Sequence, residues 1–164
     1  MIVKNEDLVY GGFNFDFRNT STRFKNLDCT LNSELMTLKG LPDIIEGDMI
    51  LTGCSSLTSL EYAPKDVYGI ISIAGCPITS LSGIGKDYLL MMLGRRFYLS
   101  AIIKSHILGV LKIRNLLFID AATNSNTPLY NAISIINKHL RSGKNINKCR
   151  AELEDNGLEE YAQL

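Results

Sequence analysis

Cysteine and histidine are the residues of this chain best suited to metal binding or nucleophilic catalysis, but their spacing argues against both. The four cysteines are Cys29, Cys54, Cys76 and Cys149. They form no C-x-x-C pair, and only His106 and His139 could assist them. Zinc and redox motifs need ligands close together in the sequence or several histidines. We therefore expect no metal, no cofactor and four mostly buried free thiols, as in proteins of a reducing cytoplasm.

The remaining candidates for catalysis lack the context that the chemistry needs. The stretch "SGIGKDY" is similar to a phosphate-binding loop, but Ser80 stands where its first glycine belongs and Asp87 where Ser or Thr belongs. A turn that ends a repeat explains this stretch better. His106 follows Ser105 without a G-x-S-x-G motif, and His139 falls in the last turn of a predicted helix, where a cation suits the helix dipole.

Charge is the strongest hint of a binding site. Residues 86–150 carry 11 basic and 2 acidic residues, a net charge of +9, although the whole chain has a formal charge of zero. Such a segment could meet phosphates or an acidic protein surface, or it could simply be a solvated face. The candidate basic site consists of Arg95, Arg96, Lys104, Lys112 and Arg114.

A repeated sequence indicates how the chain folds. The residues "LTSL" at 57–60 return as "ITSL" at 78–81, and a shift of 22 residues brings several glycines, prolines and cysteines into register. Three units fit L-x-L-x-x-N/C-x-L, the pattern of leucine-rich repeats, whose period is roughly 20–29 residues. The units begin at Leu27, Met49 and Ile71.

The pattern predicts one short strand in each unit, because apolar residues two apart point to the same face of a strand. Residues 27–31, 49–53 and 71–75 should be adjacent parallel strands, about 4.8 Å apart. The apolar residues expected to be buried are Met49, Leu51, Ile71 and Ile73. Asn32, Cys54 and Cys76 should lie where the chain turns off the strand, with their side chains bonded to neighbouring backbone.

Outward-facing residues of the same strands predict a partner-binding surface. Stacked units align these residues in columns, and the isoleucines at 50 and 70 are apolar where solvent alone would favour polar residues. An apolar centre beside acidic residues is typical of an interface, although strand propensity or a covering cap would also explain the isoleucines. The predicted partner-binding residues are Asp28, Asp48, Ile50, Ile70 and Ser72.

The flanks divide the chain into three parts. Residues 1–26, in which Phe13, Phe15 and Phe17 alternate, are expected to form an N-terminal cap, and residues 27–100 the solenoid. Residues 101–164 are expected to form a mainly helical subdomain packed on the solenoid. The predicted fold class is therefore mixed α/β: a short leucine-rich-repeat-like solenoid with a parallel sheet, capped by C-terminal helices.

Three helices and two further strands are expected after the repeats. The strands run through Phe97 and Leu99 and through residues 116–119. The first helix covers "AIIKSHILGVLKI" at residues 101–113, with Ile103, Ile107 and Leu111 on one side. In the second, Thr127 is the N-cap, Pro128 the first helical residue and Gly143 the stop. The third begins near Asn147, runs through Leu153 and ends at Gly157.

Several stretches together resemble one group of proteins. "LTSLEYAPKDVYGIISIAGCPITSL", "SHILGVLKI" and "INKCRAELEDNGLEEYAQL" are similar to leucine-rich-repeat-like proteins of tailed, T4-like bacteriophages, from about residue 35 onward. The resemblance implies a phage origin and a role in the cytoplasm of the bacterial host. It carries over no functional residues.

Composition and motifs together favour a binding protein over an enzyme. A hydrophobic content of 46% fits a globular domain, and basic residues interrupt every apolar run long enough to span a membrane. The N-terminus has no apolar stretch like that of a signal peptide. We expect a non-enzymatic module that binds a host or phage protein, for example a host defence factor that it neutralises. Nucleic-acid binding through residues 86–150 is the second hypothesis, and an enzyme without a recognisable motif is the third.

Overall fold

Successive units of the chain stack through parallel strand pairing. The computed structural model describes residues 2–3, 23–82 and 96–164. In it Leu27 pairs with Met49 and Met49 with Ile71, which confirms the predicted parallel repeat. The strands join one six-stranded sheet in the order β1-β3-β5-β7-β8-β9. They are β1 (Ile2–Val3), β3 (Asn26–Asp28), β5 (Met49–Ile50), β7 (Ile71–Ser72), β8 (Arg96–Leu99) and β9 (Phe118–Ala121).

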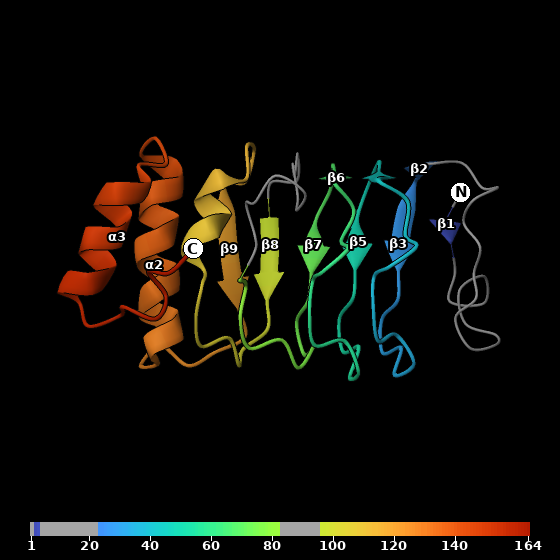
Figure 1. Ribbon diagram of the computed structural model, residues 1–164, viewed down its shortest axis with the longest axis horizontal. Helices are drawn as coiled ribbons and strands as arrows, with labels where there is room; N and C mark the ends of the chain where they lie inside the picture. Colours follow the sequence, from blue (N-terminus) through green and yellow to red (C-terminus); the bar gives the residue numbers. More distant parts are fainter. Residues whose placement is uncertain (1, 4–22, 83–95) are drawn as a thin grey trace.

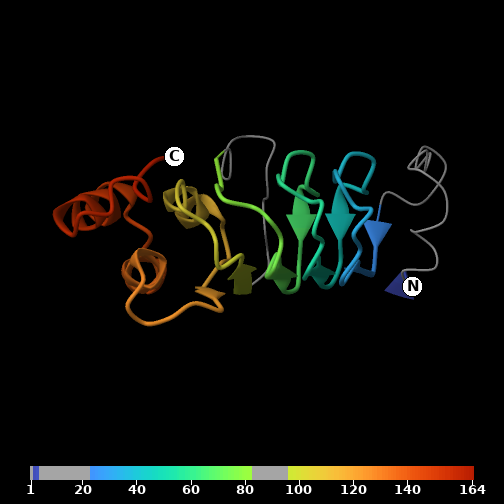
Figure 2. The same ribbon diagram turned by 90° about the horizontal axis from the view of Figure 1, so that it is seen from below.

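A second, smaller sheet lies one corner earlier in each coil. Its parallel strands, in the order β2-β4-β6, are β2 (Arg23–Phe24), β4 (Ile44–Ile45) and β6 (Asp66–Val67). Figures 1 and 2 show the coils side by side in a row, with α2 and α3 at the end opposite β1. The protein is thus a mixed α/β solenoid with C-terminal helices.

The core is continuous because every unit contributes the same apolar positions to it. The four residues expected to be buried, Met49, Leu51, Ile71 and Ile73, are completely inaccessible to solvent. Leu57 and Ile78, from the repeated "LTSL" and "ITSL", are also fully buried. One unit alone would expose this apolar edge, so each coil depends on its neighbours for burial.

The sheet continues beyond residue 100, where the predicted solenoid ends. Phe97 of β8 pairs with Ile71 of β7 on one side and with Ile119 of β9 on the other, all in parallel. The predicted strands at Phe97–Leu99 and near 116–119 are therefore members of the main sheet. The expected N-terminal strand through Phe13, Phe15 and Phe17 lies outside the described residues.

The predicted helix over residues 101–113 is wrong for most of its length. Only a 3-10 helix, η2 (Leu108–Lys112), forms there. Before it, the chain makes another coil: Ser105 forms a parallel bridge with Ser80, and the Lys104 amide donates to Thr79 O at 2.7 Å. Ile103, Ile107 and Leu111 are nevertheless buried. Their spacing serves the return path of a coil, which a helical period can imitate over a short stretch.

The two C-terminal helices form where the sequence predicts them. They are α2 (Pro128–Arg141) and α3 (Ile146–Asp155). The Thr127 side chain accepts a hydrogen bond from the Tyr130 amide at the start of α2, and Asn145 does the same for Lys148 at the start of α3. Gly143, with φ of +97°, follows the end of α2, and Gly157, with φ of +70°, follows α3.

Helix α2 closes the open edge of the sheet. The Asn137 side chain reaches β9 and imitates a further strand: its Oδ1 accepts from the Ile119 amide at 2.9 Å, and its Nδ2 donates to Ile119 O at 2.8 Å. The neighbouring groups of the edge are also bonded, since the Ala121 amide donates to Asp120 Oδ1 and Ala121 O accepts from Thr123. An uncovered edge strand would invite pairing with another chain.

We expect Asn137→Ala to destabilise the fold by about 2 kcal/mol, because it leaves the Ile119 N–H and C=O without partners. Urea unfolding measures the loss. The matched control is Asn131→Ala, an exposed residue of the same helix, which should change stability by no more than about 0.5 kcal/mol. Size-exclusion chromatography of Asn137→Ala should also show association through the exposed edge. Equal stability of the two variants would contradict the capping role.

A ladder of side chains at the corner before the main sheet requires glycine in the next coil. Asn26 Oδ1 accepts from the Asp48 amide at 2.9 Å, and Asp48 Oδ1 accepts from the Ile70 amide at 2.7 Å, each across a step of 22 residues. A Cβ added at Gly69 would meet the Asp48 carboxylate and would lie 2.6 Å from Gly47 C. The close approach of neighbouring backbones therefore leaves no room for a side chain at this position.

Gly69→Ala should therefore destabilise the solenoid by about 3 kcal/mol, because backbone rather than a flexible side chain must move. Thermal or chemical unfolding tests this. Gly157→Ala is the control: an added Cβ there meets no atom within 4 Å, so only the cost of its positive φ, about 1 kcal/mol, should appear. If Gly69→Ala is as stable as Gly157→Ala or more stable, the argument from close packing is wrong.

Candidate functional site

The main sheet brings the predicted partner-binding residues onto neighbouring strands. Strand pairing aligns Asp28 of β3 with Ile50 of β5 and Ile50 with Ser72 of β7. The same row continues to Tyr98 of β8 and Asp120 of β9, which were not among the residues predicted from the sequence. We call the side of the main sheet that carries this row, away from the core, the outward face.

Two of the predicted residues serve the solenoid itself. Asp48 holds the Ile70 amide of the next coil. Ser72 is only 6% exposed, and its hydroxyl lies 2.8 Å from Thr52 Oγ1. The polar groups of both residues are therefore bonded within the stack. The alternation of apolar and polar residues along the strands had predicted both side chains to be at the surface. A ladder of this kind is visible in a sequence only when the register of the stack is known.

The other three predicted residues remain available in part. Ile50 and Ile70 are half-buried. Asp28 is exposed and accepts hydrogen bonds from the amide and hydroxyl of Thr30, at 2.9 and 2.6 Å. One carboxylate oxygen therefore organises the local turn. The repeat end of the outward face is consequently a mildly apolar strip with one exposed acid.

The outward face is richer in aromatic and charged groups at β8 and β9. Arg96 pairs in register with Phe118, and Tyr98 with Asp120, while the intervening Phe97 is fully buried. Arg96 and Asp120 are exposed, and Tyr98 and Phe118 are half-buried. The alternation in "RFYL" and "FIDA" is the sequence signal that could have revealed this part of the face.

A groove of about 410 Å³ lies between β9 and α2. We call it the β9–α2 groove. In Figure 2, α2 is seen end-on next to β9, at the end of the row of strands. One stripe of α2, together with outward residues of β9, lines the groove. The lining residues are Phe118, Asp120, Ala121, Tyr130, Ile133, Ser134, Asn137, Lys138 and Arg141.

Interactions with neighbouring side chains hold Arg141 and Lys138 of the groove in place. The guanidinium carbon of Arg141 lies 5.9 Å from the centre of the Phe118 ring, within the range of a cation–π interaction. Lys138 donates to both carboxylate oxygens of Glu152, at 2.7 and 2.9 Å, and His139 Nε2 lies 2.8 Å from Glu152 Oε2. Hydrogen bonds from Lys138 and then from His139 lower the pKa of Glu152. This cluster ties α3 to α2 behind the groove wall.

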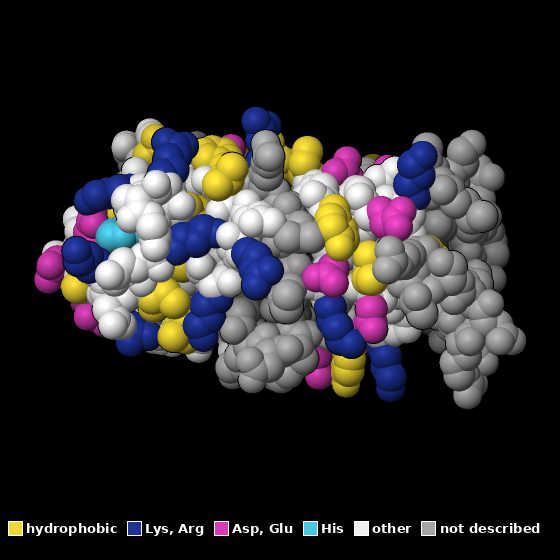
Figure 3. All heavy atoms as spheres, turned by 90° about the horizontal axis from the view of Figure 1, so that it is seen from above, with side chains coloured by type: hydrophobic (Ala, Val, Ile, Leu, Met, Phe, Trp, Pro, Cys, Tyr) yellow, Lys and Arg dark blue, Asp and Glu magenta, His cyan; other side chains and the backbone are white. Residues whose placement is uncertain are grey.

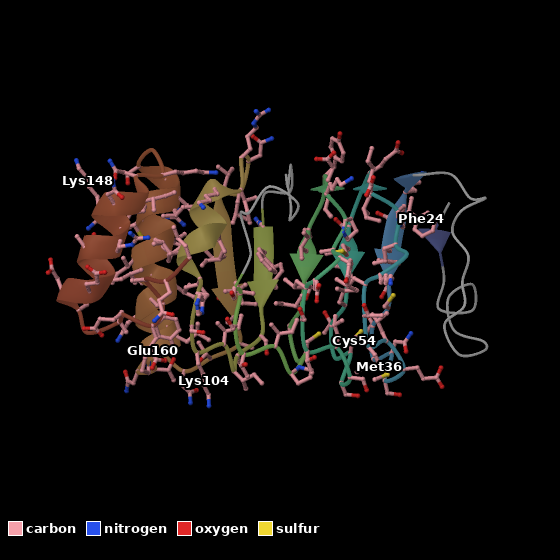
Figure 4. The ribbon with its side chains drawn as sticks, in the orientation of Figure 1. Phe24, Met36, Cys54, Lys104, Lys148 and Glu160 are labelled. Atoms are coloured by element: carbon pink, nitrogen blue, oxygen red, sulfur yellow. The ribbon has the colours of Figure 1, made fainter. Side chains whose placement is uncertain are left out.

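The residues of the predicted basic site come from several different segments of the chain. Arg95 lies outside the described residues. Of the others, Arg96 begins β8, Lys104 belongs to a coil turn, and Lys112 and Arg114 lie at and beyond the end of η2. Figure 4 places Lys104 at the lower edge of the molecule and Lys148 at the upper end of α3. In the view from above, Lys and Arg side chains are spread over the helical end (Figure 3).

One lysine of the basic segment has a structural role. Lys144 Nζ donates to Ile113 O at 2.6 Å and to Arg114 O at 2.7 Å, and burial lowers the pKa of its ammonium group. It fastens the loop between the two C-terminal helices to the end of η2. The net charge of the segment therefore overstates the number of cations that a ligand could reach.

Buried thiols carry out structural work in the coils. Cys54 Sγ donates to Cys29 O at 3.0 Å, and Cys76 Sγ donates to Leu51 O at 2.9 Å, as expected for the turn position of the repeat. Ser100 Oγ continues this ladder by donating to Cys76 O at 2.6 Å. All four cysteines are free and buried, as predicted. Burial, with a smaller contribution from Asp28, raises the pKa of Cys29 to about 12, so its thiol is protonated at neutral pH.

His106 is the best candidate for catalytic chemistry, but among the described residues no acid orients its ring. Its Nδ1 lies 2.8 Å from Ser105 Oγ and 3.1 Å from Ser80 Oγ, with the backbone at a φ of +61°. A Ser–His pair needs a third group that orients the imidazole. No such acid is bonded to His106 among the described residues. In residues 2–3, 23–82 and 96–164, no group of three or more His, Cys, Asp or Glu residues could hold a metal ion.

Comparison with known proteins leaves the fold as the basis for classification. No protein-family model, no curated protein and no solved structure matches the chain. Within the part of the chain that the structure describes, no helix is long and apolar enough to cross a membrane. The class is therefore a parallel-sheet solenoid whose outward face ends at a helix-walled groove.

The Glu152 cluster predicts a defined pH dependence. Since folding lowers the pKa of Glu152, its contribution to stability is complete above the pKa of an unfolded glutamate, about 4.3, and is lost as the pH falls through the folded value. Glu152→Gln should lower the free energy of unfolding by about 0.5–1 kcal/mol at pH 7, since the carboxylate is partly exposed. This difference from the wild type should disappear in acid. The control is Glu154→Gln at an exposed position of the same helix, which should not change stability. If the difference between Glu152→Gln and the wild type persists in acid, the ion-pair account is wrong.

Proposed function

We propose that this protein is a non-enzymatic protein-binding module that uses the outward face of its main sheet. The observation that carries the proposal is the group of aromatic and charged side chains on the outward face of β8 and β9. Tyr98 and Asp120 continue the row of Ile50, and Arg96 and Phe118 form the row beside it. Tyrosine and arginine are enriched at the energetic centres of protein interfaces. A stacked sheet holds such residues at fixed spacing, so little conformational entropy is lost on binding.

The resemblance to phage proteins suggests which kind of partner to seek. A phage protein of this kind would act in the bacterial cytoplasm on a host protein, for example by neutralising a defence factor. A phage-encoded partner is the alternative. The structural support for either is the same outward face, since the repeat alone specifies no partner.

A second candidate function rests on charge. Residues 96–150 contain nine Lys and Arg residues and one acid, Asp120, and their surface could attract nucleic acid. Against this function stand the scattered positions of Lys104 and Lys148 and the internal use of Lys144. An enzyme is the third candidate, and His106 is the residue from which a search for activity would start.

The test is affinity capture from bacteria that express the tagged full chain, with partners identified by mass spectrometry and dissociation constants then measured with the purified partner. Ile50→Asp and Tyr98→Asp should weaken binding at least tenfold, with melting temperatures within a few degrees of the wild type. Met36→Asp is the control, because Met36 is 72% exposed and lies at the lower edge of the coils (Figure 4).

The outcomes separate the candidates. Binding that both sheet-face variants retain would place the site elsewhere on the protein. Recovery that nuclease treatment abolishes, with affinity that falls steeply with salt, would favour nucleic-acid binding instead.

A further inference from the structure

The β9–α2 groove offers a site with its own chemistry at the end of the outward face. Its floor presents the Phe118 ring, and its wall presents Tyr130, Ser134 and Arg141 from successive turns of one helix. Tyr130 is 45% exposed although it is a large aromatic residue. The groove therefore combines apolar surface with polar groups, as peptide-binding grooves do.

We infer that this groove binds an extended, acidic segment of the partner protein, with an aromatic or large aliphatic side chain seated against Phe118. This inference rests on the proposed function, because it specifies which part of a protein partner reaches the outward face.

The segment must bind through its side chains rather than by adding a strand to the sheet. Strand addition needs free backbone groups at the edge, and those of β9 are already bonded. Ile119 N–H and C=O are held by Asn137, the Ala121 amide by Asp120, and Ala121 O by Thr123. A peptide therefore lies over the outward side of β9 instead of extending the sheet.

Charge complementarity specifies acidic residues at the Phe118 end. Arg96 neighbours Phe118 on β8, and Arg141 lies over its ring. The ion pairs formed among the described residues involve neither arginine. The nearest cation of the wall, Lys138, is neutralised by Glu152. One arginine over the ring and a second on the neighbouring strand suit a carboxylate next to an apolar side chain.

The other end of the groove favours neutral or hydrogen-bonding residues. Asp120 lies further along β9, and the Ala121 amide occupies one of its carboxylate oxygens. The Asp120 carboxylate would repel acidic residues of the bound segment at this end. The groove thus gives the bound segment a direction, with acids toward Phe118 and polar, uncharged residues toward Tyr130.

Length and charge pattern favour a peptide over nucleic acid. The wall of the groove runs from Tyr130 to Arg141, about 17 Å at 1.5 Å per residue, which matches about five residues of extended chain. A nucleic-acid strand would need a continuous track of cations, and Asp120 interrupts it on the floor.

Selection from a randomised heptapeptide display library against the full chain tests the inference directly. Enriched peptides should contain Asp or Glu beside an aromatic or large aliphatic residue. The best of them, synthesised with a fluorescent label, should bind at least tenfold more weakly to Arg141→Gln, to Arg96→Gln and to Ser134→Trp, in which an indole fills the groove. Lys148→Gln and Lys104→Gln, which remove equal charge elsewhere, should bind within twofold of the wild type, and circular dichroism checks that each variant is folded.

Enrichment of basic or acid-free peptides, no enrichment at all, or equal weakening by the lysine controls would each overturn the inference. Displacement of the peptide by a labelled oligothymidine of twenty nucleotides, with loss of its binding in the arginine variants, would assign the site to nucleic acid and overturn it too. A protein partner that binds Arg141→Gln and Ser134→Trp normally but not Tyr98→Asp would refute the groove while the proposed function stands. If acidic peptides bind in the groove and no protein partner is captured, the proposed function fails instead.

Discussion

The contact between the Asn137 side chain and the backbone of Ile119 determines where the solenoid stops. A parallel sheet built from repeats has no intrinsic end, because each strand presents the same unpaired groups as the last. One amide side chain supplies both the donor and the acceptor that a further strand would have provided. Because this bond fixes α2 beside β9, it also creates the wall of the groove. The end of the fold and the candidate site therefore have one physical origin.

Polar side chains inside the coils also bond to backbone groups and hold neighbouring coils together. Asp48 and Cys54 each bond to the backbone of a neighbouring coil, so residues that could take part in binding or catalysis are used to hold the stack together. This explains why the thiols are buried. It also explains why the repeat half of the outward face is chemically modest. The groups that remain free to meet a partner gather where the repeat pattern gives way, at β8, β9 and α2.

Arginine and aromatic residues at that boundary are the groups best suited to bind a partner protein. The interior supplies rigid spacing, the sheet supplies register, and α2 supplies a second surface at an angle to the sheet. Cations elsewhere in the basic segment have other places: Lys144 binds backbone carbonyls, and Lys138 is paired with Glu152. What distinguishes Arg96 and Arg141 is their common position around Phe118.

The sequence by itself determined the period, the parallel pairing, the buried apolar positions and the two C-terminal helices, because these depend on local spacing that repeats or on caps such as Thr127. It could not show that residues 101–107 continue the coils, since buried residues four apart fit a helix as well as a return path. Nor could it separate Asp48, which bonds to the next coil, from Asp28, which is exposed. Only the tertiary structure decided these points, and only it placed Phe118, Arg96 and Arg141 together. This arrangement joins segments more than 20 residues apart, and it depends on the register of the stack and on the edge that Asn137 closes.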